Sequence, residues 1–191
     1  MRAGRGEVKT AAVVLAAGAS TRLGEPKQLA RLAGETLLER AVRTAREAGC
    51  SPVVVVLGAE AGLIVEQSDL SDAVVAVNDE WSEGVASSIR VGVGVVRDAD
   101  GVVLMTCDQP AVTAAHLRAL MKTGEATASH YAGRNGVPAY LPKTAFAQLM
   151  ELRGDMGARE LLREAAAVEL AHGELDVDTA EDLARVRELF G

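Results

Sequence analysis

Short apolar runs alternate with longer amphipathic stretches along most of the chain. Four runs have the length of a strand and are almost continuously apolar: residues 11–15, 53–57, 74–77 and 102–105. Runs of this kind are typical of strands buried on both faces, as in parallel sheets covered by helices. The pattern predicts an α/β fold, a three-layer Rossmann-like open sheet that is mainly parallel and has helices on both faces.

The stretches between these runs have helical spacing. Within residues 36–48 the apolar positions recur on one face, and Gly49 stands where a helix commonly ends. Further helices are predicted over 59–66, 87–96 and 113–123, the second of these weakened by Gly92 and Gly94.

Beyond residue 124 the signals are weaker. Segments 128–131 and 138–141 are predicted strands, with Arg134-Asn135-Gly136 as the turn between them. Helices over 144–152 and 158–166, a strand near Val168 and a C-terminal helix capped by Thr179 follow. Because no repeat, low-complexity tract or linker divides the sequence, we expect residues 1–191 to form a single domain.

Composition narrows the classes of function. The chain has 27 acidic and 20 basic residues, a formal net charge of −7, and only 3% aromatic residues. Nucleic-acid binders usually carry a basic field or stacking rings, so we expect no nucleic-acid partner. No apolar run approaches the roughly 18 residues that span a bilayer, so no membrane association is expected. Cys50 and Cys107 are too few for a disulfide framework or a Cys₄ zinc site, and we expect reduced thiols in a cytoplasmic protein.

Export is the alternative to a cytoplasmic location. Arg2, Arg5 and Lys9 precede the apolar run 11–19, which ends in Ala17-Gly18-Ala19 and so resembles a signal peptide with its cleavage site. Cleavage there would destroy the loop described next, and we therefore favour the cytoplasm.

The first predicted strand runs into a loop of small residues with two cations, Leu15-Ala16-Ala17-Gly18-Ala19-Ser20-Thr21-Arg22-Leu23-Gly24-Glu25-Pro26-Lys27. Small residues let backbone N–H groups close around an anion, and Arg22 and Lys27 can neutralise phosphate oxygens. The spacing excludes G-x-G-x-x-G, a Walker A loop and a G-x-S-x-G elbow. On composition alone, a phosphate site and an ordinary loop with two solvated cations are equally favoured.

The loop also matches every fixed position of the signature L-A-[AG]-G-x-S-x-R-x-G-x-x-K. In this it resembles the MobA-like nucleotidyltransferase family, whose members attach CMP or GMP to molybdopterin. The resemblance extends over nearly the whole chain, through an N-x-x-W-x-x-G…S segment at 78–88, a D-Q-P turn at 108–110, G-D-x-G-A-R at 154–159 and D-x-D-T-x-E-D at 176–182. The family's proline in the last segment is Ala180 here, which a first helical turn accepts equally well.

The resemblance implies a nucleotide site and a metal. It assigns catalysis to Arg22, Lys27 and Asp108, and Mg²⁺ to Asp108 and Asp178. The nucleotide-binding residues that it implies are Leu15, Ala16, Ala17, Gly18, Ser20, Arg22, Lys27, Asn78, Ser87, Ser88 and Asp108. It leaves the roles of Asp155 and Arg159 open.

The residues themselves agree with the metal assignment. Asp108 follows the apolar run 102–105, so it should emerge at the carboxyl edge of a central strand, where open α/β sheets bind ligands. Carboxylates completed by water and phosphate suit Mg²⁺. Asp176 and Asp178 alternate in extended sequence, so we expect them on opposite sides, and the resemblance favours Asp178 as the one that faces the metal. Without the rest of the pattern, Asp108 would be an ordinary turn residue before proline.

The resemblance further implies the reaction. In that family L-A-A-G accompanies CTP and L-A-G-G accompanies GTP, and the methyl group of Ala17 would narrow the space for the base. We therefore expect a cytidylyltransferase that transfers CMP from CTP to the phosphate of molybdopterin and releases pyrophosphate. The alternatives are GTP or another nucleotide, another phosphate acceptor, or a carrier that delivers the cofactor to a partner molybdoenzyme. Val137, where many relatives are expected to carry a polar residue, leaves the acceptor open.

Overall fold

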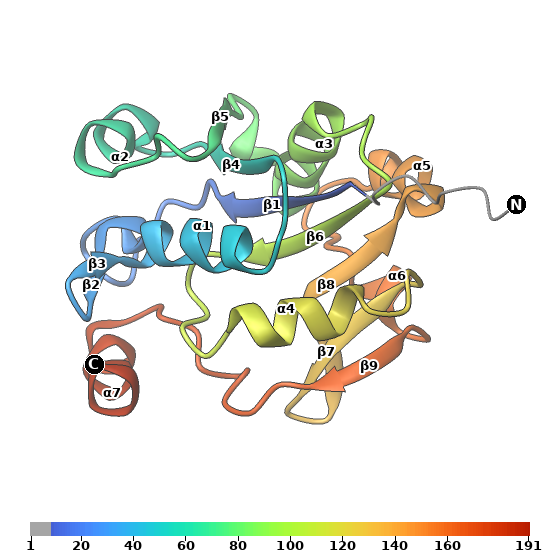
Figure 1. Ribbon diagram of the computed structural model, residues 1–191. Helices are drawn as coiled ribbons and strands as arrows, with labels where there is room; N and C mark the ends of the chain where they lie inside the picture. Colours follow the sequence, from blue (N-terminus) through green and yellow to red (C-terminus); the bar gives the residue numbers. More distant parts are fainter. Residues whose placement is uncertain (1–8) are drawn as a thin grey trace, which may run out of the picture.

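The centre of the molecule is a seven-stranded sheet. The computed structural model describes residues 9–191, so Arg2 and Arg5 of the export alternative lie outside the described residues. The strand order is β5-β4-β1-β6-β8-β7-β9 (Figure 1). The strands are β1 (Thr10–Ala16), β4 (Val53–Leu57), β5 (Val74–Val77), β6 (Gly101–Thr106), β7 (Thr127–Tyr131), β8 (Arg134–Pro142) and β9 (Ala166–Glu169).

The sheet is open and mainly parallel, as predicted. β1 pairs in parallel with both β4 and β6, and β4 pairs in parallel with β5. β8 runs antiparallel to both of its neighbours, β6 and β7, and β9 returns to the parallel direction beside β7.

Helices cover both faces of the sheet, which confirms the three-layer prediction. α1 (Leu37–Glu47), α2 (Ala61–Gln67) and α4 (Ala114–Met121) pack on the face seen in Figure 1, and α3 (Val85–Val95), α5 (Phe146–Glu151) and α6 (Arg159–Leu162) pack on the other. Along β1, Ala12 and Val14 contribute to the core under α1 and α4, whereas Ala11 and Val13 contribute to the core under α3 and α5. Because both faces are buried, the strand reads as a continuous apolar run.

Smaller elements complete the chain. The hairpin β2 (Arg31–Leu32) and β3 (Glu35–Thr36) shares a third apolar cluster with α7 (Ala180–Phe190). Three 3₁₀ turns span Lys27–Leu29, Trp81–Glu83 and Lys143–Ala145. The predicted cap of the last helix is present, since the Thr179 side chain accepts a hydrogen bond from the backbone N–H of Asp182.

Two placements in the second half of the chain differ from the prediction. The hairpin turn is Ala132-Gly133, with φ of 48° and 72°, and Arg134-Asn135-Gly136 already belongs to β8. Two successive positive φ angles suit the twist of a two-residue hairpin turn, and this sets Tyr131 opposite Arg134. The helix predicted over 158–166 ends at Leu162, because Ala166–Glu169 pairs with β7 as a strand.

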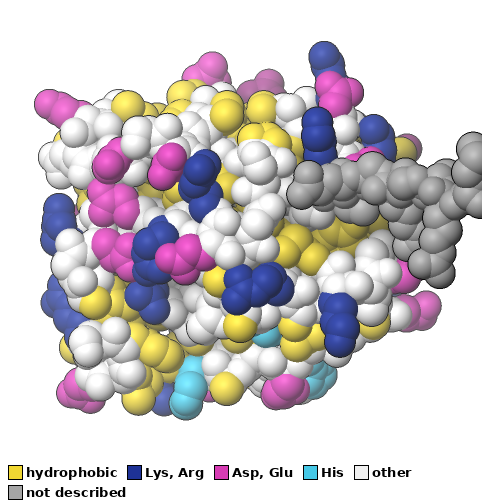
Figure 2. All heavy atoms as spheres, viewed as in Figure 1, with side chains coloured by type: hydrophobic (Ala, Val, Ile, Leu, Met, Phe, Trp, Pro, Cys, Tyr) yellow, Lys and Arg dark blue, Asp and Glu magenta, His cyan; other side chains and the backbone are white. Residues whose placement is uncertain are grey.

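Surface charge on the face of α1 is mixed. Arg43 forms ion pairs with Glu35 (2.5 Å) and Glu47 (3.0 Å), and Figure 2 shows acidic and basic side chains interspersed there rather than gathered by sign. Exposed pairs of this kind each contribute at most about 1 kcal/mol to stability.

Both cysteines are free, as predicted. Both are also buried, and burial raises the pKa of each thiol to about 12. Within residues 9–191, no helix combines the length and the apolar character that crossing a bilayer needs.

Candidate active site

The small-residue loop and the Asp108 turn leave the sheet side by side. β1 and β6 are neighbours, and Leu15 near the end of one strand is in register with Thr106 at the end of the other. The strand order reverses at this point, because β4 and β5 lie on one side of β1 and β6 lies on the other. Open α/β sheets bind ligands at such a reversal, outside the carboxyl ends of the strands.

A pocket of about 390 Å³, called here the loop pocket, opens at this edge. It collects many of the predicted nucleotide-binding residues in one wall: Leu15, Ala16, Ala17, Gly18, Lys27, Ser88 and Asp108. Gln28, Trp81, Thr106 and Asp155 also line it and were not predicted to bind nucleotide.

Gln28 holds the small-residue loop in shape. Its side chain is almost fully buried, and its Nε2 donates to the carbonyl oxygens of Ala16 (2.6 Å) and Gly18 (3.1 Å). Ser20, in the left-handed region with φ of 51°, accepts a hydrogen bond from the backbone N–H of Lys27 through its Oγ (3.0 Å). Because glutamine is a polar residue, the hydrophobic pattern of the sequence did not predict that Gln28 would be buried.

Lys27 lies between two carboxylates that come from distant parts of the chain. Its Nζ is 2.5 Å from Oδ2 of Asp108 and 2.8 Å from Oδ1 of Asp178. Burial alone lowers the pKa of Lys27, but the charges and hydrogen bonds of the two carboxylates outweigh it and raise the pKa above its usual value. The structure thus brings together the two predicted metal ligands and one predicted catalytic cation.

Arg22 lies at the outer side of this cluster. One of its terminal nitrogens is 3.4 Å from Oδ2 of Asp178, and its side chain is 74% exposed. Such an exposed contact contributes little to stability, and it leaves the guanidinium free to reorient toward a ligand.

Asp176 lies closer to the cluster than the alternation argument predicted. Desolvation, followed by the negative charge of Asp108, raises the pKa of Asp176 to about 7. In extended backbone the side chains alternate with a period of two, so residues two positions apart lie on the same side. Leu175 and Val177 are buried, and the more exposed Asp176 and Asp178 alternate with them. The expectation that Asp176 and Asp178 would point to opposite sides is therefore wrong.

Asn78 and Ser87 lie behind the wall of the loop pocket. Asn78 is buried, and its Nδ2 donates to Oγ of Ser87 (2.8 Å) and of Ser88 (3.0 Å). Ser87 donates in turn to the carbonyl oxygen of Gly84 (2.8 Å). Of the three, only Ser88 lines the pocket, and the other two fix the first turn of α3.

Two glycines bring the remaining motif segments into contact. A Cβ on Gly58 would lie 2.6 Å from Cβ of Trp81 and 2.8 Å from the carbonyl oxygen of Ala17, so this position accepts no side chain. Gly84, with φ of +123°, leaves no room for a Cβ beside the backbone of Gly154 and Oδ1 of Asp155. Asp155 is held at the loop pocket by this close packing.

The sequence also matches a known protein family. Residues 12–170 match the family model described as the MobA-like NTP transferase domain. The chain belongs to this family. As a MobA-like NTP transferase it is a nucleotidyltransferase, and the small-residue loop, the Asp108 turn and most of the sheet lie inside the matched region.

Relatives with curated names and solved structures cover almost the whole chain. The chain is 31% identical to nicotine blue oxidoreductase of Paenarthrobacter nicotinovorans, over 93% of each protein. It is 35% identical to the probable molybdenum cofactor guanylyltransferase of Opitutus terrae, over 83% of this chain and 78% of that protein.

Among solved structures, Rv0371c of Mycobacterium tuberculosis is 36% identical, with a TM-score of 0.84 over 95% of this chain and 98% of that one. The same protein in complex with manganese matches with 33% identity and a TM-score of 0.79, over 95% and 99% of the two chains.

Proposed function

We propose that this MobA-like transferase moves CMP from CTP to the phosphate of molybdopterin and releases pyrophosphate. The observation that carries the proposal is the Asp108–Lys27–Asp178 cluster at the edge of the small-residue loop. The similar protein of Opitutus terrae, named as a probable molybdenum cofactor guanylyltransferase, supports molybdopterin as the acceptor.

The two carboxylates fit a divalent metal. They converge on one cationic atom, Nζ of Lys27, which shows that both can face a single positive charge. Residues 9–191 contain no group of three or more acidic, histidine or cysteine side chains arranged for a metal. A pair of carboxylates completed by water and phosphate oxygens is the set that Mg²⁺ usually takes, and the manganese complex of Rv0371c supports a divalent metal in this family. Asp108 and Asp178 would hold it.

The chemistry then needs positioning and charge neutralisation. An oxygen of the acceptor phosphate attacks the α-phosphorus of CTP, and the bond from that phosphorus to the oxygen bridging to the β-phosphate breaks. The acceptor phosphate is already ionised, so no side chain has to remove a proton. A divalent metal, when bound, would supply positive charge to the triphosphate, and Lys27 and Arg22 would neutralise the departing pyrophosphate.

The loop supports CTP as the nucleotide. Ala17 lines the loop pocket, and its carbonyl oxygen accepts a hydrogen bond from the backbone N–H of Ala59 (3.1 Å). Because this backbone is fixed by that bond, by Gln28 and by Trp81 over Gly58, the methyl group of Ala17 cannot withdraw to admit a larger base. Ser88 and the backbone of the small-residue loop line the same pocket and would contact the nucleotide.

The test is turnover with purified protein, Mg²⁺, molybdopterin and each of the four nucleoside triphosphates in turn. We expect pyrophosphate release with CTP, and a rise in GTP turnover for Ala17→Gly, while Ala19→Gly, outside the pocket lining, serves as the matched control. Turnover of GTP but not CTP by the unchanged protein would refute the base assignment. Absence of turnover with every nucleotide would refute molybdopterin as the acceptor.

A further inference from the structure

A second cavity, called here the arginine pocket, adjoins the loop pocket. It has a volume of about 240 Å³, and the two pockets share Leu15, Val85 and Thr106 as a common boundary. A group bound in one cavity therefore meets a group bound in the other over the carboxyl ends of β1 and β6. A transfer reaction between two substrates needs two adjoining compartments of this kind.

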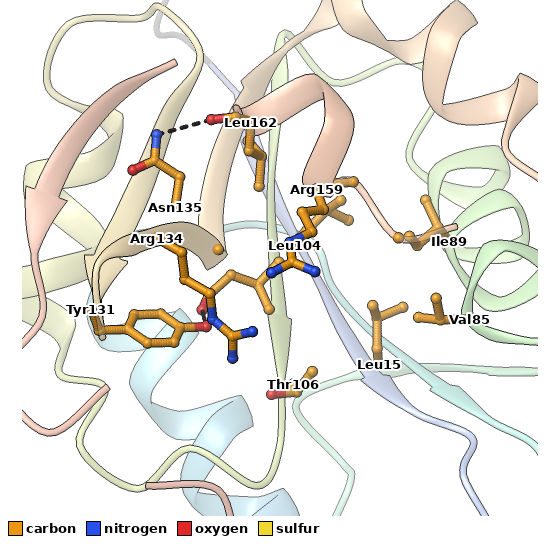
Figure 3. A pocket seen from close by; sticks show the side chains of 14 residues that line it. Leu15, Val85, Ile89, Leu104, Thr106, Tyr131, Arg134, Asn135, Arg159 and Leu162 are labelled. Atoms are coloured by element: carbon orange, nitrogen blue, oxygen red, sulfur yellow. Dashed lines mark hydrogen bonds between the residues drawn. The ribbon is translucent and has the colours of Figure 1, made fainter. Parts of the chain in front are cut away.

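The arginine pocket has apolar walls and two positive charges. Ile89, Leu104 and Leu162 supply apolar surface, and Arg134 and Arg159 are its charged lining residues, with no acidic side chain among the lining. Figure 3 shows both guanidinium groups directed into the same space, Arg134 from the start of β8 and Arg159 from the start of α6.

Neither Arg134 nor Arg159 forms a salt bridge with a side chain that the structure describes. Within residues 9–191, the salt bridges involve other arginines, including Arg163, which pairs with Glu160 one helical turn from Arg159. The guanidinium carbon of Arg134 lies 6.0 Å from the centre of the Tyr131 ring, which orients it over the cavity without cancelling its charge.

Hydrogen bonds brace the segments that carry this pair of arginines. The Tyr131 hydroxyl donates to the carbonyl oxygen of Val137 (2.9 Å) and accepts from Nε2 of Gln109 (3.3 Å). On the other side, Nδ2 of Asn135 donates to the carbonyl oxygen of Leu162 (2.9 Å), which ties β8 to α6. Two arginines without an acidic partner among the described residues, on a hydrogen-bonded framework, form a site suited to an anion.

We propose that the arginine pocket binds the acceptor, a phosphate monoester that carries a fused ring system, and that Arg134 and Arg159 together hold its phosphate. The inference rests on the proposed function, and it assigns the acceptor's place. Two forked cations would offset the repulsion between the incoming phosphate and the triphosphate, while the apolar walls contact the ring. Because the loop pocket lies across the shared boundary, the arginines bind the acceptor and leave the nucleotide to the loop.

The first experiment separates acceptor binding from nucleotide binding. Kinetic constants are measured for Arg134→Gln, Arg159→Gln and the double variant, with Arg163→Gln as the matched control, because Arg163 does not line the cavity. We expect the KM for molybdopterin to rise about tenfold in each single variant and more in the double variant, with the KM for CTP unchanged. An unchanged acceptor KM in the double variant, a matched rise in both KM values, or a fall in kcat alone would each overturn the proposal.

A binding measurement keeps the proposal testable when molybdopterin is not the acceptor. Equilibrium dialysis compares 4-methylumbelliferyl phosphate with 4-methylumbelliferone, which has the same flat ring and no phosphate. We expect the wild-type protein and Arg163→Gln to prefer the phosphate about tenfold or more, and the double variant to lose that preference. Equal binding of both compounds, or of neither, by the wild-type protein would overturn the arginine pocket as a phosphate site. Failure of pyrophosphate release with intact phosphate preference would instead refute the proposed function alone.

Discussion

The two halves of the sheet present anion sites by different physical means. Beside the parallel strands β4, β1 and β6, the loop pocket is made of backbone and small residues that a buried amide, Gln28, holds in place. Beside the antiparallel β8 and its partner β7, the arginine pocket has apolar walls and takes its charge from two long side chains, one on a hairpin and one on a short helix. Backbone recognition is rigid and tolerates few substitutions, whereas side-chain recognition can change with single residues. We therefore expect the loop pocket to determine which reaction is catalysed, and the arginine pocket to determine which acceptor binds.

The largest effect should come from Asp108, the carboxylate that lines the loop pocket and contacts Lys27. Asp108→Asn removes one charge from the Lys27 cluster while Asp178 stays paired, so folding should persist. We expect kcat to fall more than about a hundredfold, since charge stabilisation in the transition state is lost. Pyrophosphate release checks this, with the exposed Asp98→Asn as the control. A kcat near that of the control would show that neither half relies on Asp108.

Gly84 joins the two halves, and its replacement should disturb both. Gly84→Ala places a Cβ against Gly154 at a positive φ, and we expect a loss of about 2–3 kcal/mol in the free energy of unfolding. Gly94→Ala in α3 has open space, so it should gain about 0.5–1 kcal/mol. Chemical denaturation measures both. Equal effects of the two variants would contradict the close approach of residues 154–155 to Gly84.

Gln28→Met tests whether the loop pocket acts independently. The variant keeps the side-chain volume but leaves the carbonyl oxygens of Ala16 and Gly18 without their donor. Since each buried hydrogen bond contributes about 1 kcal/mol, we expect the KM for CTP to rise about tenfold while the KM for the acceptor stays constant. The exposed Gln148→Met is the control. A change in the acceptor KM of similar size would show that the two halves are coupled.

The smallest effect concerns pH and the hairpin half. Burial lowers the pKa of His116, whose Nε2 contacts Oγ of the fully buried Ser129 (2.7 Å). The unfolded chain therefore binds the proton more readily, so this part of the stability is complete above pH 6.5 and is lost as pH falls below it. His116→Gln should remove that loss, and the difference in Tm between variant and wild type should change by about 2 °C between pH 8 and pH 5. Asp176, whose raised pKa acts with the opposite sign, is common to both proteins and cancels. A constant difference would exclude His116 as the source.

The sequence predicted the parallel half better than the hairpin half, for physical reasons. β1, β4 and β6 are buried on both faces, so nearly all of their residues are apolar and the sequence alone identifies them as strands. In the hairpin, Asn135-Gly136 has the composition of a tight turn, but Ala132-Gly133 forms it, because the Asn135 side chain is engaged by α6. Local composition cannot show such a long-range contact.

The candidate site divides in the same way. The small-residue loop, Lys27, Asp108 and Asp178 could be predicted, since each follows a strand or a motif that fixes its place. The burial of Gln28 and Asn78 and the convergence of Arg134 and Arg159 depend on tertiary packing, which leaves no periodic trace in the sequence.

The ammonium of Lys27 also acts as a tethered counter-ion for the acidic pair. Because it contacts both Asp108 and Asp178 and offsets one of their two negative charges, the fold does not depend on an added cation to keep two acids together. A divalent cation has to compete with this ammonium, and nucleotide phosphates give Lys27 another partner. Metal and nucleotide should therefore each strengthen the binding of the other, by the reciprocity that links any two ligands of one protein.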